Sequence, residues 1–134
     1  MKKYNHIIWD WNGTLLNDRW LCVEAINQAL NKRNLPMLTE GKYKDVFSFP
    51  VEDYYKKVGF DFSKEPFHIA GDEFVTYYGN NFFRVELHSD SISVLKKIRE
   101  SGRSQSVLSA GKQDFLTDWI KNHNLSDYFI KILG

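Results

Sequence analysis

Residues 7–16 read Ile-Ile-Trp-Asp-Trp-Asn-Gly-Thr-Leu-Leu, and this stretch decides the expected fold. A run of apolar residues ends abruptly in a carboxylate, Asp10, and Gly13 follows shortly after it. The apolar run indicates a buried strand, and a glycine allows the tight backbone turn that would follow it. Such a strand delivers Asp10 to the carboxyl edge of a sheet, where open α/β proteins place their ligand sites. We therefore expect Asp10 to carry chemistry.

The composition argues against several classes of protein. With 134 residues, the chain can form one ordinary domain or a small domain with an insertion. Its net charge of +1 gives no reason to expect a nucleic-acid partner. Cys22 is the one cysteine, so no intramolecular disulfide can form and a reducing, cytoplasmic location is expected. The first apolar run is interrupted by Asp10, which argues against a signal peptide and a membrane span.

Between Asn17 and Arg84 the spacing of apolar residues is helical, and no strand pattern occurs. The first helix is expected to begin at Asn17 or Asp18 and to stop before Pro36. Capping residues, prolines and glycines then predict three further helices, over about residues 39–46, 50–59 and 63–82. This block predicts an all-helical insertion after the first strand.

Strand and helix patterns alternate again in the last third of the chain. Helical spacing covers residues 91–100 and 112–123, and short strands are expected at 104–109 and 128–133. Successive parallel strands joined by right-handed crossovers tend to lie side by side. We therefore predict an α/β fold with one parallel sheet, in which three strands stand in chain order.

The motif at residues 10–15, Asp-Trp-Asn-Gly-Thr-Leu, resembles motif I of the haloacid dehalogenase (HAD) superfamily of phosphoryl-transfer hydrolases. The usual motif is D-x-D-G-T-[LV], so the chain departs from it at Asn12. The helical block that follows resembles the C1-type cap of phosphoglycolate phosphatase-like members. The resemblance implies a HAD-like Rossmannoid core with strands 1-2-3, formed by residues 1–16 and 85–134, and a helical cap formed by residues 17–84.

The resemblance also implies a role for each residue of the motif. Asp10 would attack phosphorus, form an aspartyl-phosphate and bind Mg²⁺, whose second ligand from this motif would be the carbonyl group of Asn12. The backbone N–H groups of Trp11 and Asn12, together with Thr14, would bind the phosphate.

Asn12 changes what the motif can do. The second Asp of the family motif is a general acid and base, whereas an amide cannot titrate. Loss of such help typically lowers a rate by about 10²- to 10⁴-fold. Three interpretations stay open: a slow phosphatase, a phosphoryl enzyme for activated leaving groups, or a protein that binds phosphate without turnover.

Ser109 ends a predicted strand and resembles motif II of the family, whose hydroxyl and adjacent N–H bind a phosphate oxygen. The alternative is that Ser109 caps the helix that follows. In either case Ser109, Ala110 and Gly111 would form an anion site at a helix N-terminus. Lys112 is either a cation that neutralises the phosphate or a solvated surface lysine.

The resemblance fails toward Gly134. Motif III, a Lys or Arg, and motif IV, an acidic pair that completes the Mg²⁺ site, would lie beyond this residue. We therefore expect a truncated member with weak or no activity. Since the family sheet order is 5-4-1-2-3, the Asp10 strand would be an exposed edge through which the chain could self-associate.

Two functions are consistent with the sequence. The leading hypothesis is a cytoplasmic, Mg²⁺-dependent hydrolase, a phosphatase of a small phosphorylated metabolite, with no nucleic-acid or membrane partner. The alternative is a non-catalytic phosphate-binding or protein-interaction module. Neither the composition nor the motifs identify a substrate.

Overall fold

The computed structural model describes residues 4–134, and the chain divides into two compact units. The first, which we call the core unit, combines the residues up to Asn17 with Glu86–Gly134. The second, the cap unit, is Asp18–Val85. These boundaries lie one residue further along the chain than those placed from the sequence.

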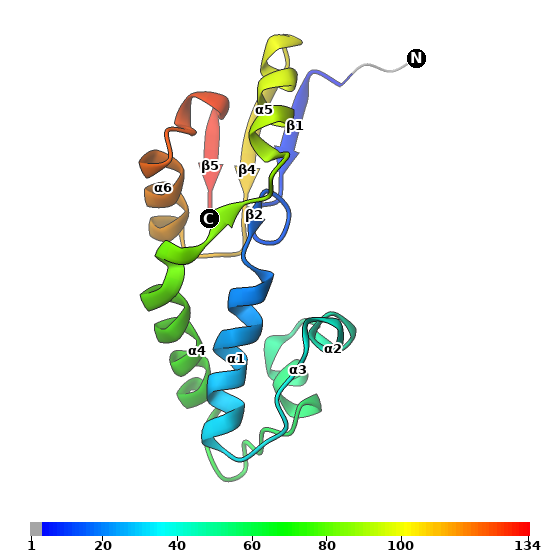
Figure 1. The fold of residues 1–134 in the computed structure, drawn as a ribbon, viewed down its shortest axis with the longest axis vertical. Helices are drawn as coiled ribbons and strands as arrows, with labels where there is room; N and C mark the ends of the chain where they lie inside the picture. The colour runs from blue at the N-terminus through cyan, green and yellow to red at the C-terminus, as the bar shows by residue number, and fades with distance from the viewer. Residues whose placement is uncertain (1–3) are drawn as a thin grey trace. The chain divides into compact units, whose positions relative to one another are not determined.

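The core unit contains a three-stranded parallel sheet in the order β1-β4-β5 (Figure 1). The strands are β1 (His6–Trp9), β4 (Ser104–Leu108) and β5 (Lys131–Leu133). Helix α5 (Ser91–Glu100) precedes β4, and helix α6 (Gln113–Asn122) with the short 3-10 turn η2 (Ser126–Tyr128) leads to β5. The predicted parallel sheet in chain order is confirmed.

One face of this sheet is buried, whereas the other exposes apolar side chains at two positions of β1 and β4. On the buried face, Gln105 accepts a hydrogen bond from Trp9 Nε1 (2.8 Å) and donates one to the Leu95 carbonyl of α5 (3.1 Å). On the other face, Ile8 and Leu108 are 62% and 56% exposed. Both crossovers run the same way across the sheet, and right-handed connections then place both helices on one face.

A second, two-stranded sheet was missed by the sequence analysis. Strand β2 (Leu16–Asn17) pairs antiparallel with β3 (Glu86–Leu87). The Leu15 carbonyl extends this pairing, because it accepts hydrogen bonds from His88 N and Ser91 Oγ, both at 2.9 Å. Strands of two residues are too short to show an alternating pattern, so their pairing depends on tertiary contacts.

Two strand ends also differ from the prediction. The strand expected over residues 104–109 ends at Leu108, and the strand expected from residue 128 begins at Lys131. Tyr128, where this strand was expected to begin, is instead the last residue of the turn η2. Apolar spacing alone does not separate a 3-10 turn from the start of a strand, because both place apolar residues on the buried side.

The cap unit consists of four α-helices and a short 3-10 turn. They are α1 (Arg19–Lys32), α2 (Glu40–Val46), α3 (Val51–Lys57), α4 (Phe67–Asn81) and η1 (Phe82–Arg84). The predicted start signals are confirmed, since Asp18 and Thr39 hold the N-cap positions of α1 and α2, and Thr39 Oγ1 accepts from Lys42 N (3.1 Å). Pro50 and Pro66 hold the same position before α3 and α4.

The cap unit has its own apolar core. Helix α1 buries Ile26 and Leu30 against aromatic side chains from the other helices, among them Tyr54 and Tyr55. Arg33 closes this core at one side, because its guanidinium pairs with Glu65 and with Glu73 (2.7 Å) and lies over the ring of Phe60. No helix in residues 4–134 is long and apolar enough to cross a membrane.

Candidate active site

Asp10 lies immediately after β1, with its carboxylate exposed at the end of the strand. Two neighbours in the following turn hold it: Trp11 N donates to Asp10 Oδ1 (2.9 Å) and Thr14 Oγ1 donates to Oδ2 (3.2 Å). Both donors are neutral. The carboxylate is therefore oriented while its negative charge stays uncompensated by any ion pair recorded for residues 4–134.

The turn after Asp10 is tight and depends on its glycine. The Trp11 carbonyl accepts hydrogen bonds from three successive backbone N–H groups, those of Thr14, Leu15 and Leu16. Gly13 has φ +76°, a left-handed conformation that side chains with a Cβ disfavour. The Gly-Thr pair of the motif thus has a mechanical reason: the glycine makes the turn, and the threonine holds the carboxylate.

The buried side chain of Trp11 fixes the turn to the core. Its side chain is 2% exposed and packs edge-to-face on Trp119 of α6, with ring centroids 5.4 Å apart. Aromatic pairs in this geometry stabilise a fold beyond the area that they bury. Trp11 therefore contributes to the site by fixing its backbone, whereas its indole faces the core.

Ser109 brings the second predicted motif to the same place. It follows β4, the neighbour of β1, and its hydroxyl donates to Asn12 Oδ1 (3.0 Å), 97 residues away in the sequence. The same hydroxyl accepts from Gly111 N (3.0 Å). A Cβ at Gly111 would lie 3.3 Å from Ser109 Oγ and 3.4 Å from Asn12 Oδ1, so glycine leaves room for this contact.

Two local details differ from the sequence interpretation. Trp11 N, one of the predicted phosphate donors, already bonds to the carboxylate of Asp10. Ser109 N bonds to the Leu133 carbonyl of β5 (2.8 Å). Ser109 is also not a helix cap, because α6 begins at Gln113 and Lys112 holds its N-cap position. The loop of Ser109 to Gly111 therefore precedes the helix N-terminus instead of forming it.

The remaining predicted residues lie at the surface. Ala110, Gly111 and Lys112 are exposed, and the ammonium group of Lys112 lies over the ring of Phe115, 5.9 Å from its centroid. Gln113 was not predicted to matter, yet its amide donates to the Ile132 carbonyl (3.0 Å) and so ties α6 to β5. A glutamine at a helix start carries no sequence signal that would have revealed this.

The donor set for a metal ion is small. Asp10 supplies one carboxylate, and Asn12 supplies the neutral oxygen of its backbone carbonyl. Among the described residues, no group of three or more His, Cys, Asp or Glu side chains could hold a metal ion. Mg²⁺ demands near-octahedral oxygen coordination, so the residues described here do not complete a magnesium site.

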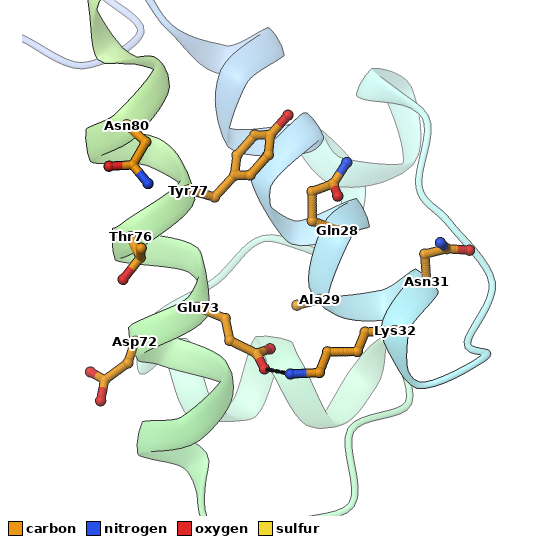
Figure 2. Close-up of a pocket in the computed structure, with 9 residues that line it drawn as sticks. All are labelled: Gln28, Ala29, Asn31, Lys32, Asp72, Glu73, Thr76, Tyr77 and Asn80. Carbon is orange, nitrogen blue, oxygen red and sulfur yellow. Dashed lines mark hydrogen bonds and ion pairs between the residues drawn. The ribbon is translucent and has the colours of Figure 1, made fainter.

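A cavity lies elsewhere, within the cap unit. Figure 2 shows this open groove of about 560 Å³ between α1 and α4, with polar side chains from both helices around it. Lys32 and Glu73 form an ion pair across it (2.6 Å). Its lining consists of Gln28, Ala29, Asn31, Lys32, Asp72, Glu73, Thr76, Tyr77 and Asn80. None of these residues was predicted to carry chemistry, and the candidate site stays at Asp10.

Comparison with known proteins identifies the family. The model of the haloacid dehalogenase-like hydrolases matches residues 7–134, which include both motifs, and the chain belongs to this family. No curated protein matches the sequence.

Solved structures share the fold. A predicted phosphoglycolate phosphatase from Haemophilus somnus 129PT matches with a TM-score of 0.79 and 20% identity over 100% of this chain and 64% of its own. A haloacid dehalogenase-like hydrolase from Streptococcus pneumoniae matches with a TM-score of 0.77 and 16% identity, over 96% of this chain and 60% of its own. Protein tyrosine kinase A from Mycobacterium tuberculosis matches with a TM-score of 0.81 and 18% identity, over 97% of this chain and 59% of its own.

At these identities the similarity establishes the fold and not the substrate. The fold is that of the phosphatase-like HAD proteins, a Rossmann-like parallel sheet combined with helices, as the motif had implied. The chain spans about three fifths of the length of these structures. What a whole protein of this kind acts on is therefore a matter for proposal.

Proposed function

We propose that this chain carries the nucleophile of a cytoplasmic HAD-type phosphatase that acts on a small phosphorylated metabolite. The observation that carries the proposal is the position of Asp10: an exposed carboxylate at the carboxyl end of β1, held by two neutral donors, in a family of hydrolases. The hydrogen bond between Ser109, which follows β4, and Asn12, which follows β1, supports the proposal, because it brings polar groups from two neighbouring strand ends together.

In the proposed reaction, a carboxylate oxygen of Asp10 attacks phosphorus in line. The bond between phosphorus and the leaving oxygen breaks, and the leaving group departs with its electron pair. Water then attacks the aspartyl-phosphate, which releases phosphate and restores the carboxylate. Trp11 N and Thr14 Oγ1 fix the direction of the carboxylate, and such orientation lowers the barrier to attack.

The hydroxyl of Ser109, directly after β4, is the second proposed phosphate ligand. It is held by Gly111 N and lies at hydrogen-bond distance from Asn12 Oδ1, so a small rotation would turn its proton toward a phosphate oxygen. Asn12 can hydrogen-bond the phosphate but cannot protonate a leaving alkoxide. We therefore expect activated leaving groups, such as acyl phosphates, to react faster than alkyl phosphates.

Mg²⁺ is part of the proposal because of the family. In it, Asp10 and Asn12 are the ligands that this chain would contribute, and the ion would neutralise charge on the phosphate. Since the described residues do not complete such a site, we expect little or no turnover of alkyl phosphates by residues 1–134.

Labelling with a radioactive acyl phosphate, such as acetyl phosphate, tests the nucleophile. We expect an acid-stable, hydroxylamine-sensitive phosphoryl group on the chain, lost in Asp10→Asn and kept in Asp114→Asn, a matched change at an exposed carboxylate of α6. Labelling that survives Asp10→Asn would exclude Asp10 as the nucleophile.

Asn12 favours one alternative, a module that binds phosphate without turnover, because its amide is locked to Ser109 and cannot titrate. In that case nuclear magnetic resonance would detect binding of inorganic phosphate at Asn12 and Ser109, but no label would form. Asn12→Asp should not create phosphatase activity in this chain. In a version that also carries the motif III and motif IV residues, it should raise alkyl phosphate turnover at least about tenfold.

A further inference from the structure

The loop of residues 110–112 leads from the end of β4 to α6, and both of its ends are tied to β5 (Figure 1). At its start, Ser109 N donates to the Leu133 carbonyl (2.8 Å). At its end, the carboxamide of Gln113, the first residue of α6, donates to the Ile132 carbonyl (3.0 Å). The three loop residues are exposed. The two attachments to β5 therefore set the path that the loop can take.

The carboxamide of Gln113 bonds to the end of β5 in the way that a strand backbone would. Its nitrogen donates to the carbonyl of Ile132, and its oxygen accepts from the N–H of Gly134, two residues along the chain. A residue in a parallel sheet bonds to the C=O and N–H groups of its neighbour with the same spacing. One side chain thus makes two bonds to β5, and its removal would break both.

The backbones of the loop and of the end of β5 lie in close contact. A Cβ at Gly134 would lie 2.7 Å from Gln113 Cα and 3.1 Å from the Gly111 carbonyl oxygen. Only glycine leaves room for backbones to approach this closely. The carboxamide of Gln113 therefore acts at a point where loop and strand already touch.

The position of Gly111 decides how the hydroxyl of Ser109 is turned. Gly111 N donates to Ser109 Oγ (3.0 Å), which uses a lone pair of the oxygen. The hydroxyl proton is then directed away from Gly111 and reaches Asn12 Oδ1 (3.0 Å). Without the bond from Gly111 N, Ser109 would be released to its other staggered rotamers. The orientation of this hydroxyl thus depends on the path of the loop.

We propose that Gln113 is a positioning residue for Ser109. Its carboxamide holds the first turn of α6 on the end of β5, which keeps Gly111 N on Ser109 Oγ and directs the hydroxyl toward Asn12. Gln113 acts through the loop and not as a phosphate ligand. The importance of the hydroxyl for binding phosphate rests on the proposed function, whereas its orientation by Gln113 does not.

Hydrogen exchange of the Gly111 amide, followed by nuclear magnetic resonance, tests the orientation without a ligand. Gln113→Met keeps the length of the side chain and removes both bonds to β5. We expect the Gly111 N–H to exchange at least about fivefold faster in this variant, because the loop opens more often when two hydrogen bonds are lost. Unchanged exchange in Gln113→Met would overturn the proposal.

Thr117→Val is the matched control for this measurement. Thr117 Oγ1 is the other acceptor of the Gln113 carboxamide nitrogen (2.9 Å), so the change removes one bond of the same group and leaves its bonds to β5 in place. Exchange of the Gly111 N–H should stay within about twofold of the unmodified chain. Equal acceleration by Thr117→Val and Gln113→Met would overturn the assignment of the effect to β5.

Titration with inorganic phosphate tests the consequence for the anion site. Gln113→Met should raise the Kd, read from the amide signals of Ser109 and Gly111, at least about fivefold. Ile120→Val trims a fully buried side chain about two turns further along α6, so it should lower the urea midpoint and leave the Kd unchanged. A Kd that follows the urea midpoint in both variants would show that Gln113 only stabilises α6, and would overturn the positioning role.

The two measurements separate this proposal from the proposed function. If the unmodified chain does not bind phosphate, the anion site fails, and the exchange of the Gly111 amide still decides whether Gln113 holds the loop. If Gln113→Met accelerates that exchange but binds phosphate as tightly as the unmodified chain, the orientation of the Ser109 hydroxyl does not serve binding and the positioning role is wrong.

Discussion

The two units use their charged side chains in opposite ways. In the cap unit, Arg33 pairs with Glu65 and Glu73, and Glu24 accepts from Arg84 and Tyr77, each at 2.8 Å. In the core unit, Asp10 is exposed and is held by neutral donors from its own turn. Charges that neutralise each other stabilise a fold, whereas a carboxylate oriented by neutral groups stays able to attack or to bind.

The pKa values in the cap unit follow this pairing. Burial of Glu73 opposes ionisation, but hydrogen bonds from Arg33 and Lys32 outweigh it and lower the pKa of the carboxyl below its usual range. Hydrogen bonds from Arg84 and Tyr77 lower the pKa of Glu24. The cap unit therefore holds both acids ionised at neutral pH.

The largest expected effect tests whether the core unit depends on the anchor of its turn. Trp11→Ala should lower the free energy of unfolding by about 3–5 kcal/mol, since it removes a buried aromatic side chain and leaves a cavity against Trp119. Urea denaturation measures this. Tyr4→Ala, at a residue that is 73% exposed, should change stability by less than about 0.5 kcal/mol. If Trp11→Ala lowered the free energy of unfolding by less than about 1 kcal/mol, the turn would be held by its backbone alone.

A second, smaller effect tests the ion pairs of the cap unit. Arg33→Met should destabilise by about 2–3 kcal/mol, because two carboxylates lose their partner while the apolar stem is kept. Lys32→Met removes a cation from the same Glu73, but the lysine side chain is 69% exposed, so we expect less than about 1 kcal/mol. Equal losses in urea denaturation would mean that burial does not distinguish the two pairs.

Glycine-to-alanine substitutions should change the free energy of unfolding in opposite directions in the two units. Gly13→Ala places a Cβ on a residue with φ +76° and should destabilise by about 1–2 kcal/mol, although no atom lies within 4 Å of that Cβ. Gly41→Ala in α2 has space and no left-handed backbone, so it should stabilise by about 0.5–1 kcal/mol. Thermal unfolding of both variants checks the pair, and stabilisation by Gly13→Ala would contradict the turn geometry.

The smallest expected effect concerns pH. Because the pKa values of Glu24 and Glu73 are lowered in the folded state, their contribution is present above about pH 4.5, the usual range of a glutamate, and is lost as pH falls through the folded values. Urea midpoints should therefore drop between about pH 5 and pH 3. Part of this drop should vanish in Glu24→Gln, measured against Glu52→Gln on the exposed side of α3 as a control. If Glu24→Gln showed the same pH profile as the unmodified chain, the ion pair of Glu24 would not contribute to the stability of the cap unit.

Much of the fold could be predicted because local signals marked its elements. Thr39, Pro50 and Pro66 mark helix starts, and Gly59 and Gly102 end helices with positive φ. Each signal acts within a few residues of chain. The order of the three strands followed from topology, since short right-handed crossovers leave few alternatives.

The details that escaped prediction all depend on residues distant in sequence. The pairing of β2 with β3 joins segments about seventy residues apart, and neither segment shows a pattern of its own. At the site, topology alone placed Asp10 and Ser109 at one sheet edge. That Ser109 Oγ donates to Asn12, and that Trp11 N turns back to Asp10, depends on the exact path of two loops.

The β2–β3 ribbon has a consequence for how such a protein can evolve. Leu16 stands opposite Leu87 and Asn17 opposite Glu86, so the two ends of the 68-residue insertion, Asp18–Val85, emerge from adjacent backbone positions. For the core unit, the insertion is equivalent to the loop of a hairpin formed by β2 and β3. Because the entropy of loop closure rises slowly with length, helices can be added, removed or exchanged there at small cost to the sheet. A lineage can thus change the inserted helices while β1, the strand that presents Asp10, keeps its register with β4.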